Sequence, residues 1–342
     1  MTRPSSAAPA ALAARRMGRR TLLGLATGVA LVAAASACSP DPTIRGSHVG
    51  AQPPTPSATP SPAQLALADQ EEALAALLSA TAARTSDTPT SQKAWLAAAA
   101  AQCLAHAERL RQVDALGVPA SSASASASPT SSTNAGTPPA SWVAAQKTIT
   151  QRADQLAGAH RSAALAATDG PLALFHASAS VAAHGIRQPG LAPVVATIRP
   201  AAVEVGTLND ARLVLLSQLR ALVQGLEVGT GRLPLPDEHY SPALARITQV
   251  LAERDQVIAA LEAAKVEIPA AELSYTMPGG FGSVGAILTT WGRLETSVMD
   301  GWGRVAAAAT GADRTTAIDQ MVRHADQARA RGVALDWWPG WA

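Results

Sequence analysis

The chain has 342 residues, of which 48% are hydrophobic and only 15% are charged, so it is long enough for one or two folded domains. Basic and acidic residues almost balance, at 27 against 25, and only 3% of residues are aromatic. Because the charges are spread along the chain and aromatic residues are scarce, this composition argues against a nucleic-acid partner.

The first 37 residues have the organisation of an export signal. Five arginines and no acidic residue precede an apolar run from Leu22 to about Ala35, which is shorter than the ~20 residues of a membrane-spanning helix. Arg19-Arg20-Thr21-Leu22-Leu23 fits the twin-arginine pattern, which directs export of folded chains. A general secretory signal is the alternative. We predict that residues 1–37 are a cleaved signal peptide.

The end of this signal favours lipid attachment. Ala35-Ser36-Ala37-Cys38 resembles a bacterial lipobox, with Ala35 where leucine is more usual. The thiol of Cys38 would carry a diacylglyceryl group, and two acyl chains hold a protein on a membrane where one chain holds it only marginally. The alternative is a soluble secreted protein. We predict a lipoprotein anchored to the extracytoplasmic face of the cell membrane.

Removal of the signal changes both the charge and the cysteine count. Five arginines leave with it, so 22 basic residues face 25 acidic ones and the net charge becomes −3 instead of +2. Cys103 is then the only cysteine besides Cys38, which leaves no intramolecular disulfide. The alanine and leucine neighbours of Cys103 indicate a small core residue and not a nucleophile.

Two stretches with few large apolar residues divide the mature chain. Residues 38–61 are rich in Pro, Ser and Thr and suit a disordered linker between a lipid anchor and a folded body. Residues 120–140 have a similar composition. Because helical periodicity resumes on both sides of this second stretch, we expect a disordered insertion within a domain.

The rest of the sequence has the 3.6-residue periodicity of helices, with start and stop signals and no competing strand pattern. The predicted helices run from Ser61 to about Arg84, Ser91 to Gly117, Ser141 past Ala163, Asp169 to Gly185, Thr207 to Gly229, Ser241 to Pro269, Val284 to Val305, and about Asp313 to Arg331. The sixth of these has an apolar stripe formed by Leu244, Ile247, Leu251, Ile258 and Leu261.

These helices predict an all-α fold. Alanine allows helices to approach closely, and apolar residues spaced by seven favour shallow crossing angles. We expect two up-and-down four-helix bundles of the ferritin-like kind, or one continuous helical array. The first bundle would span residues 62–188 and the second domain residues 205–342.

The second half resembles the actinobacterial ferritin-like lipoprotein domain, a family of unknown function. Five segments carry the resemblance: LLSQLRALVQGLEVG, AERDQVIAALEAA with Arg254-Asp255, IPAAELSYTMP with Tyr275 and Pro278, GRLETSVMDGW with Leu294-Glu295, and the closing WWPGW. A lipobox and a Pro/Ser linker are also usual in that family. The resemblance implies ferritin-like packing of residues 205–341.

The chain departs from this family at the positions of its polar residues. The family tends to have an acidic residue and a histidine in its first helix and a histidine before the Arg-Asp pair, where this chain has Gln218-Leu219 and Val250-Leu251. A di-iron centre needs several carboxylates and two histidines, usually with Glu-x-x-His motifs, and the sequence has no such motif. We therefore predict no metal and no cofactor in the second bundle.

Glu295, Gln218 and Arg254 form the candidate remnant of a site. Glu295 lies beside the strongest apolar stripe of the chain. It is either a half-buried acid with a raised pKa that serves a site, or a structural acid paired with an arginine of a neighbouring helix. We favour the structural pair, with Arg254 as the partner.

Histidines are the remaining candidate ligands. His106, His160, His176 and His184 all fall in the first bundle, and His176 and His184 are spaced to share a helix face. Four imidazoles together would suit a transition metal, but no carboxylate stands at partner spacing. We favour separate structural roles for them.

The carboxyl-terminal LDWWPGWA contains three of the seven tryptophans. This tail either inserts into a partner or the membrane surface, or folds back as a lid over one end of the second bundle. We favour the lid.

Motifs of nucleophilic, phosphate-binding or dithiol enzymes are missing from the sequence. Three functions stay open: an envelope lipoprotein whose body binds a protein partner or acts as a scaffold, a ferritin-like metal or redox enzyme, and a carrier of a small apolar ligand in a pocket lined by Trp291 and Trp302. We favour the first, with the membrane bound through Cys38.

Overall fold

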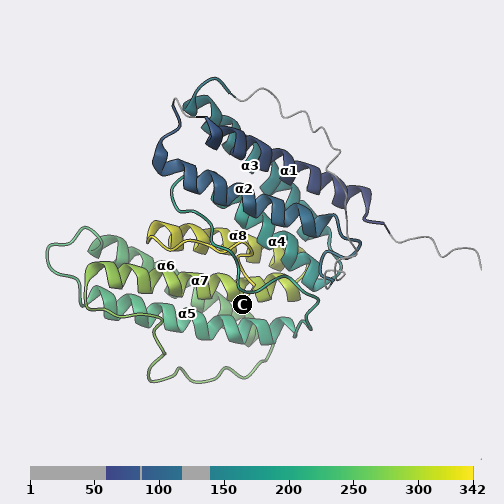
Figure 1. Cartoon of the computed structure of the whole chain (residues 1–342). Coiled ribbons are helices and arrows are strands. Elements are labelled where there is room, and N and C mark those ends of the chain that lie inside the picture. Colours follow the sequence, from purple (N-terminus) through teal and green to yellow (C-terminus); the bar gives the residue numbers. More distant parts are fainter. Residues whose placement is uncertain (1–58, 85–86, 118–138, 342) are drawn as a thin grey trace, which may run out of the picture. The chain divides into compact units, whose positions relative to one another are not determined.

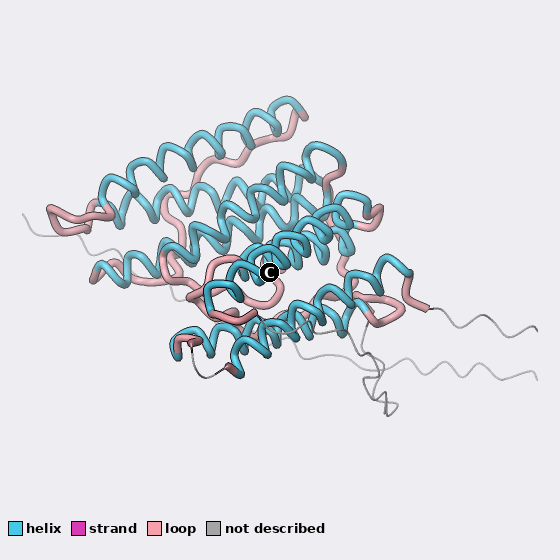
Figure 2. The backbone as a smooth tube through the Cα atoms, turned by 90° about the horizontal axis from the view of Figure 1, so that it is seen from above, coloured by secondary structure: helices cyan, strands magenta, loops and turns pink. Residues whose placement is uncertain are grey.

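The computed structural model describes residues 59–84, 87–117 and 139–341, and every structural statement below refers to these (Figure 1). The predicted signal peptide, Cys38 and nearly all of the two Pro/Ser/Thr-rich stretches lie outside them. The described part is all-α, as predicted, and Figure 2 shows helices joined by loops. None of these helices has an apolar stretch that would cross a bilayer.

Eight helices are present in the described part of the chain. Their bounds are α1 Pro62–Ala83, α2 Thr90–Leu110, α3 Trp142–Ala166, α4 Gly170–Ile186, α5 Leu208–Thr230, α6 Tyr240–Ala263, α7 Val284–Ala308 and α8 Gly311–Ala330.

Several helix starts follow the capping residues of the sequence. The side chains of Ser61, Ser141, Asp169 and Thr207 each accept a hydrogen bond from a backbone N–H in the first turn. α2 begins behind Pro89 without a side-chain cap. It also ends seven residues before the predicted stop at Gly117, because residues 111–117 form turns.

The helices pack in pairs, consistent with two four-helix bundles. In the first half α1 packs on α2 and α3 on α4, and α1 also contacts α3. In the second half α5 packs on α6 and α7, and α7 packs on α8. The halves meet where α4 lies against α7 and α8. Apolar packing is continuous across this junction, because one core cluster holds Phe175 of α4 together with Trp302 of α7.

The carboxyl-terminal tail folds back, as predicted, but it lies at the junction of the two halves. Trp338 is 4% exposed and packs against the rings of His106 and Phe175 in the first half. Gly340 lies against Gly303 of α7 in the second half. The tail therefore contacts both bundles, and at the second its last residues lie beside the start of α5 and the end of α7.

Cys103 is a core residue, as predicted. Its side chain is 1% exposed and its thiol is free. Burial and the nearby charge of Glu71 raise the pKa of this thiol well above its usual range. A thiol held protonated in this way is a poor nucleophile.

Candidate functional site

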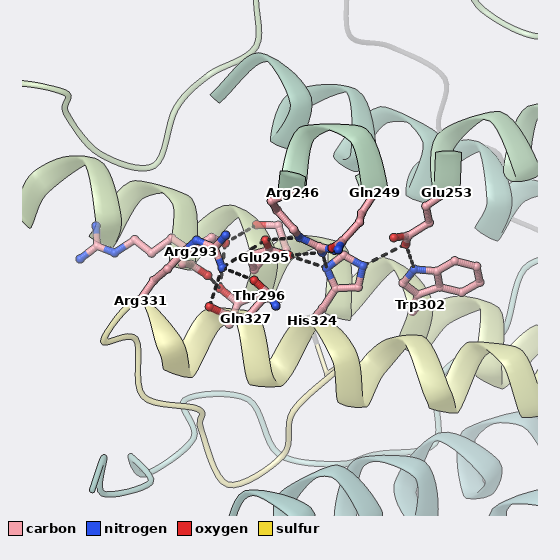
Figure 3. Close-up of polar contacts among 12 residues, drawn as sticks. Arg246, Gln249, Glu253, Arg293, Glu295, Thr296, Trp302, His324, Gln327 and Arg331 are labelled. Carbon is pink, nitrogen blue, oxygen red and sulfur yellow. Dashed lines mark hydrogen bonds and ion pairs between the residues drawn. The ribbon is translucent and has the colours of Figure 1, made fainter. Parts of the chain in front are cut away.

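The interior of the second bundle contains a buried polar cluster, which we call the arginine cluster (Figure 3). It consists of Arg246 and Glu253 from α6, Glu295 from α7 and His324 from α8, each at most 4% exposed. Arg246 donates from Nε to Glu295 Oε1 at 2.9 Å and from Nη2 to Oε2 at 2.8 Å. Such two-pronged pairs combine charge with fixed geometry.

His324 lies between the two carboxylates of this cluster. Its Nδ1 is 2.6 Å from Glu295 Oε2 and its Nε2 is 2.9 Å from Glu253 Oε1. Because a carboxylate only accepts hydrogen bonds, both ring nitrogens must donate and the imidazole carries a positive charge. Trp302 Nε1 also donates to Glu253 Oε1, at 2.6 Å.

The charges of the arginine cluster hold each other in their ionised forms. Burial alone would raise the pKa of Glu295, but the hydrogen bonds from His324 and Arg246 lower it to about 2. Burial likewise opposes ionisation of Glu253, whose pKa is lowered chiefly by the charge of His324. Burial would lower the pKa of His324, yet Glu253 and Glu295 raise it above its usual 6.5. The two acids thus face Arg246 and His324, and Arg331 Nη1 lies 3.5 Å from Glu295 Oε1 at the edge of the cluster.

The prediction for Glu295 was right about the kind of partner and wrong about its identity. An arginine of α6 pairs with it, but this is Arg246; Arg254 is on the exposed side and pairs with Asp255 at 2.7 Å. The alternative of a raised pKa is also wrong, since the pKa is lowered.

The error follows from the choice of the buried face of α6. The large aliphatic residues indicated a face that includes Leu244, yet Leu244 is 45% exposed. The buried face is formed by Ala243, Arg246, Val250, Glu253, Val257 and Leu261. Arg246 and Glu253 sit at three- and four-residue spacing from Val250, which is the signal that could have identified them.

Gln218 does not join the arginine cluster by any hydrogen bond within the described residues. It lies on α5 facing Gly301 of α7, and its buried Oε1 has no partner there. Leu219 and Val250, at positions where the resembled family tends to have histidines, are 0% exposed. The interior of the second bundle is therefore apolar at these two positions.

The first bundle contains a second buried polar group, which we call the histidine cluster. Each of its four helices supplies one member: Glu71, His106, His160 and His176. His106 Nδ1 and His160 Nε2 lie 2.8 and 3.1 Å from the same oxygen of Glu71, and His160 Nδ1 lies 3.1 Å from His176 Nδ1. Sequence reasoning identified the three histidines but missed Glu71.

The histidine cluster also holds the carboxyl-terminal tail. His106 Nε2 is 2.8 Å from the backbone carbonyl of Trp337. His106 thus lies between an oxygen of Glu71 and the backbone carbonyl of Trp337. Burial would raise the pKa of Glu71, but His106 and His160 lower it to about 2. Burial, followed by the charge of His160, lowers the pKa of His176 to about 3.

The structure separates His184 from the other three histidines. His184 is 3.3 Å from Asp326 of α8, so the predicted shared face of His176 and His184 does not bring them together. The ring nitrogens of the remaining three do not converge on one point, because His160 uses opposite nitrogens for Glu71 and His176. Across the described residues, no group of three or more His, Cys, Asp or Glu side chains is placed to hold a metal ion.

Comparison with known families finds a domain of unknown function in the second half of the chain. Residues 220–342 match the family model described as a domain of unknown function, DUF4439. This region begins within α5 and includes the whole arginine cluster and the tail, whereas the histidine cluster lies outside it. No curated protein and no solved structure matched the chain.

Proposed function

We propose that the protein is a lipoprotein of the cell envelope, anchored through Cys38, whose helical body is a binding or scaffolding module without a metal centre in its second bundle. The observation that supports this most is the position of Arg246 between the helices. Its guanidinium is a permanent cation attached to the chain, and it occupies both oxygens of Glu295.

The donors of the second bundle do not fit a pair of iron ions. Ferritin-like centres use carboxylates from four helices and two histidines. Here Glu253, Glu295 and His324 are hydrogen-bonded to Arg246, Trp302 or each other, and Leu219 offers no donor. A divalent cation beside Arg246 would add positive charge to an interior in which Arg246, His324 and the nearby Arg331 already face only two carboxylates.

The histidine cluster supports a scaffolding role for the body. It joins one side chain from each helix of the first bundle to the tail, through the 2.8 Å contact of His106 with Trp337. The tail continues to Gly340, which packs on α7 of the second bundle. A body whose parts are cross-connected in this way can hold a fixed surface toward a partner in the envelope.

Metal analysis tests the metal-free centre. We expect the full chain, purified without chelator from cells supplied with iron and manganese, to contain far less than one equivalent of either metal. A Glu295→Gln variant should have the same metal content. Stoichiometric iron or manganese in the parent protein that is lost in Glu295→Gln would overturn this part of the proposal and favour a metal or redox protein.

Cell fractionation tests the anchor. We expect Cys38→Ser to move the protein from the membrane fraction to the soluble fraction, and mass spectrometry of the parent protein to find diacylglyceryl on Cys38. Cys103→Ser is the matched control and should stay with the membrane, because Cys103 is a buried core residue. A Cys38→Ser protein that stays on the membrane would rule out the lipid anchor.

A further inference from the structure

A cavity opens where α4, α5, α7, the 187–207 connector and the tail meet. Its volume is about 320 Å³, which is at the lower end of the range for small-molecule sites. Leu174, Ile198, Val203, Val214 and Trp341 supply much of its apolar wall. Trp291 and Trp302, which the sequence suggested as the lining of a ligand pocket, instead donate hydrogen bonds within the core.

Several aliphatic side chains of this cavity remain open to solvent. Ile198 is 47% exposed, Val203 49% and Val214 41%, although all three lie close to the buried junction of the bundles. Exposed aliphatic residues that gather at a concave site are typical of surfaces that bind an apolar partner. The wall thus favours a ligand with a compact hydrocarbon body.

The polar side of the cavity is acidic. Glu204 and Asp210 both line it, and hydrogen bonds from Thr207 lower the pKa of Asp210, so its carboxylate is ionised at neutral pH. Arg304 is the basic residue of the lining, and its charge acts on Asp300. With two carboxylates and one guanidinium among its lining residues, the apolar cavity favours a cationic group over an anionic one.

We propose that this cavity binds a small organic amine, with its hydrocarbon body against Val203, Val214 and Trp341 and its ammonium group beside Glu204 and Asp210. This inference goes beyond the proposed function, since neither a lipid anchor nor a metal-free centre requires a ligand. If the cavity does not bind an amine, the proposed function is unaffected, and if the proposed function is wrong, the amine-binding proposal is unaffected.

Three probes with the same hydrocarbon cage separate the contribution of charge from that of shape. Calorimetric titration of the purified full chain at pH 7 and low salt would compare 1-adamantylamine, 1-adamantanol and 1-adamantanecarboxylate. We expect the amine to bind about tenfold more tightly than the carboxylate, with the alcohol between them, and added salt to reduce this difference. Absence of binding by the amine, or equal or tighter binding of the carboxylate, would overturn the proposal.

Two substitutions in the lining, Val214→Trp and Glu204→Gln, locate the site. Val214→Trp should fill the cavity and abolish binding of the amine, whereas Val228→Trp is the matched control at a position that is 40% exposed and does not line this cavity. Glu204→Gln should weaken binding of the amine but leave binding of the alcohol unchanged. Undiminished amine binding in a folded Val214→Trp protein would overturn the assignment of this cavity.

Discussion

Arg246 and Glu295 form a buried ion pair with two hydrogen bonds, of 2.9 and 2.8 Å, between α6 and α7. The two side chains are 3% and 0% exposed. Removing one member of such a pair leaves an uncompensated charge in the interior, whereas apolar replacement of both removes the need for compensation. We therefore expect the pair to contribute more to the specificity of helix packing than to net stability.

Replacement of Arg246 by methionine should destabilise the protein strongly. We expect Arg246→Met to lower the free energy of unfolding by about 3–5 kcal/mol, since buried Glu295 would lose both hydrogen bonds from the guanidinium. The double variant Arg246→Met/Glu295→Met should recover a large part of this loss. Denaturant titration of all three proteins measures both effects.

Arg254→Met provides the control for this comparison. Arg254 pairs on the surface with Asp255, so its loss should change the free energy of unfolding by less than about 1 kcal/mol. Equal effects of Arg246→Met and Arg254→Met would contradict the pairing that we describe.

Stability should depend on the protonation of His324. Its pKa is raised in the folded protein, so its contribution is fully present below pH 6.5 and is lost as the pH rises through the folded pKa. We expect the urea midpoint of the parent protein to fall as the pH is raised from 6 to 9. His324→Gln should be less stable at pH 6 and should show less of this decline. An unchanged pH profile in His324→Gln would assign the decline to another group.

Asp300 should also make stability fall as the pH rises, but in a lower pH range, because its ionised form is disfavoured in the folded state. Burial and the neighbouring Asp336 raise the pKa of Asp300 from 3.8 to about 7. The native protein then retains a proton that the unfolded chain releases, so stability falls as the pH rises from about 4 to 7. We expect Asp300→Asn to be more stable than the parent by about 1–3 kcal/mol at pH 8 and equal to it near pH 3.5. A thermal-melting series across this pH range measures the difference, and a variant that is less stable at pH 8 would contradict it.

Docking of the tail should be sensitive to one glycine of α7. A Cβ atom at Gly303 would lie 2.6 Å from the backbone carbonyl oxygen of Gly340, which cannot move without displacing the tail. We expect Gly303→Ala to lower the free energy of unfolding by about 1–3 kcal/mol. Proteolysis of the carboxyl-terminal residues should also become faster.

Gly285→Ala in the same helix is the matched control. A Cβ atom at Gly285 would meet nothing within 4 Å, so alanine there should leave stability unchanged or raise it by about 0.5–1 kcal/mol. A Gly303→Ala protein as stable as Gly285→Ala would show that the tail does not pack closely on α7.

The helices could be predicted because their signals are local. Thr207 and Asp210 cap each other across three residues at the start of α5, and this reciprocal pattern can be read from the sequence without any tertiary contact. The same holds for the caps at Ser61, Ser141 and Asp169. Apolar spacing then predicts that these helices must pack, and the all-α fold follows.

The members of the two polar clusters could be predicted only in part. His106, His160 and His176 could be identified as candidates because histidine is rare in this chain. Glu71, by contrast, cannot be distinguished in the sequence from acids on helix surfaces, because its burial depends on the packing of α1. On α6, Arg246 was overlooked because the larger aliphatic residues indicated a different face, and that face is decided by contacts with α5. The geometry of a helix fixes the angle between any two of its residues around the helix axis, but it does not fix which side of the helix faces the core.

The sequence by itself determined the number of helices in the described region and most of their ends, because hydrogen bonding within a helix and at its caps involves neighbours along the chain. Tertiary structure alone decided that Arg246 pairs with Glu295, that Glu71 joins three histidines, that the tail lies between the bundles, and where the cavity opens. Each of these depends on residues far apart in the chain, whose distances are set by how the helices cross and in which register they pack.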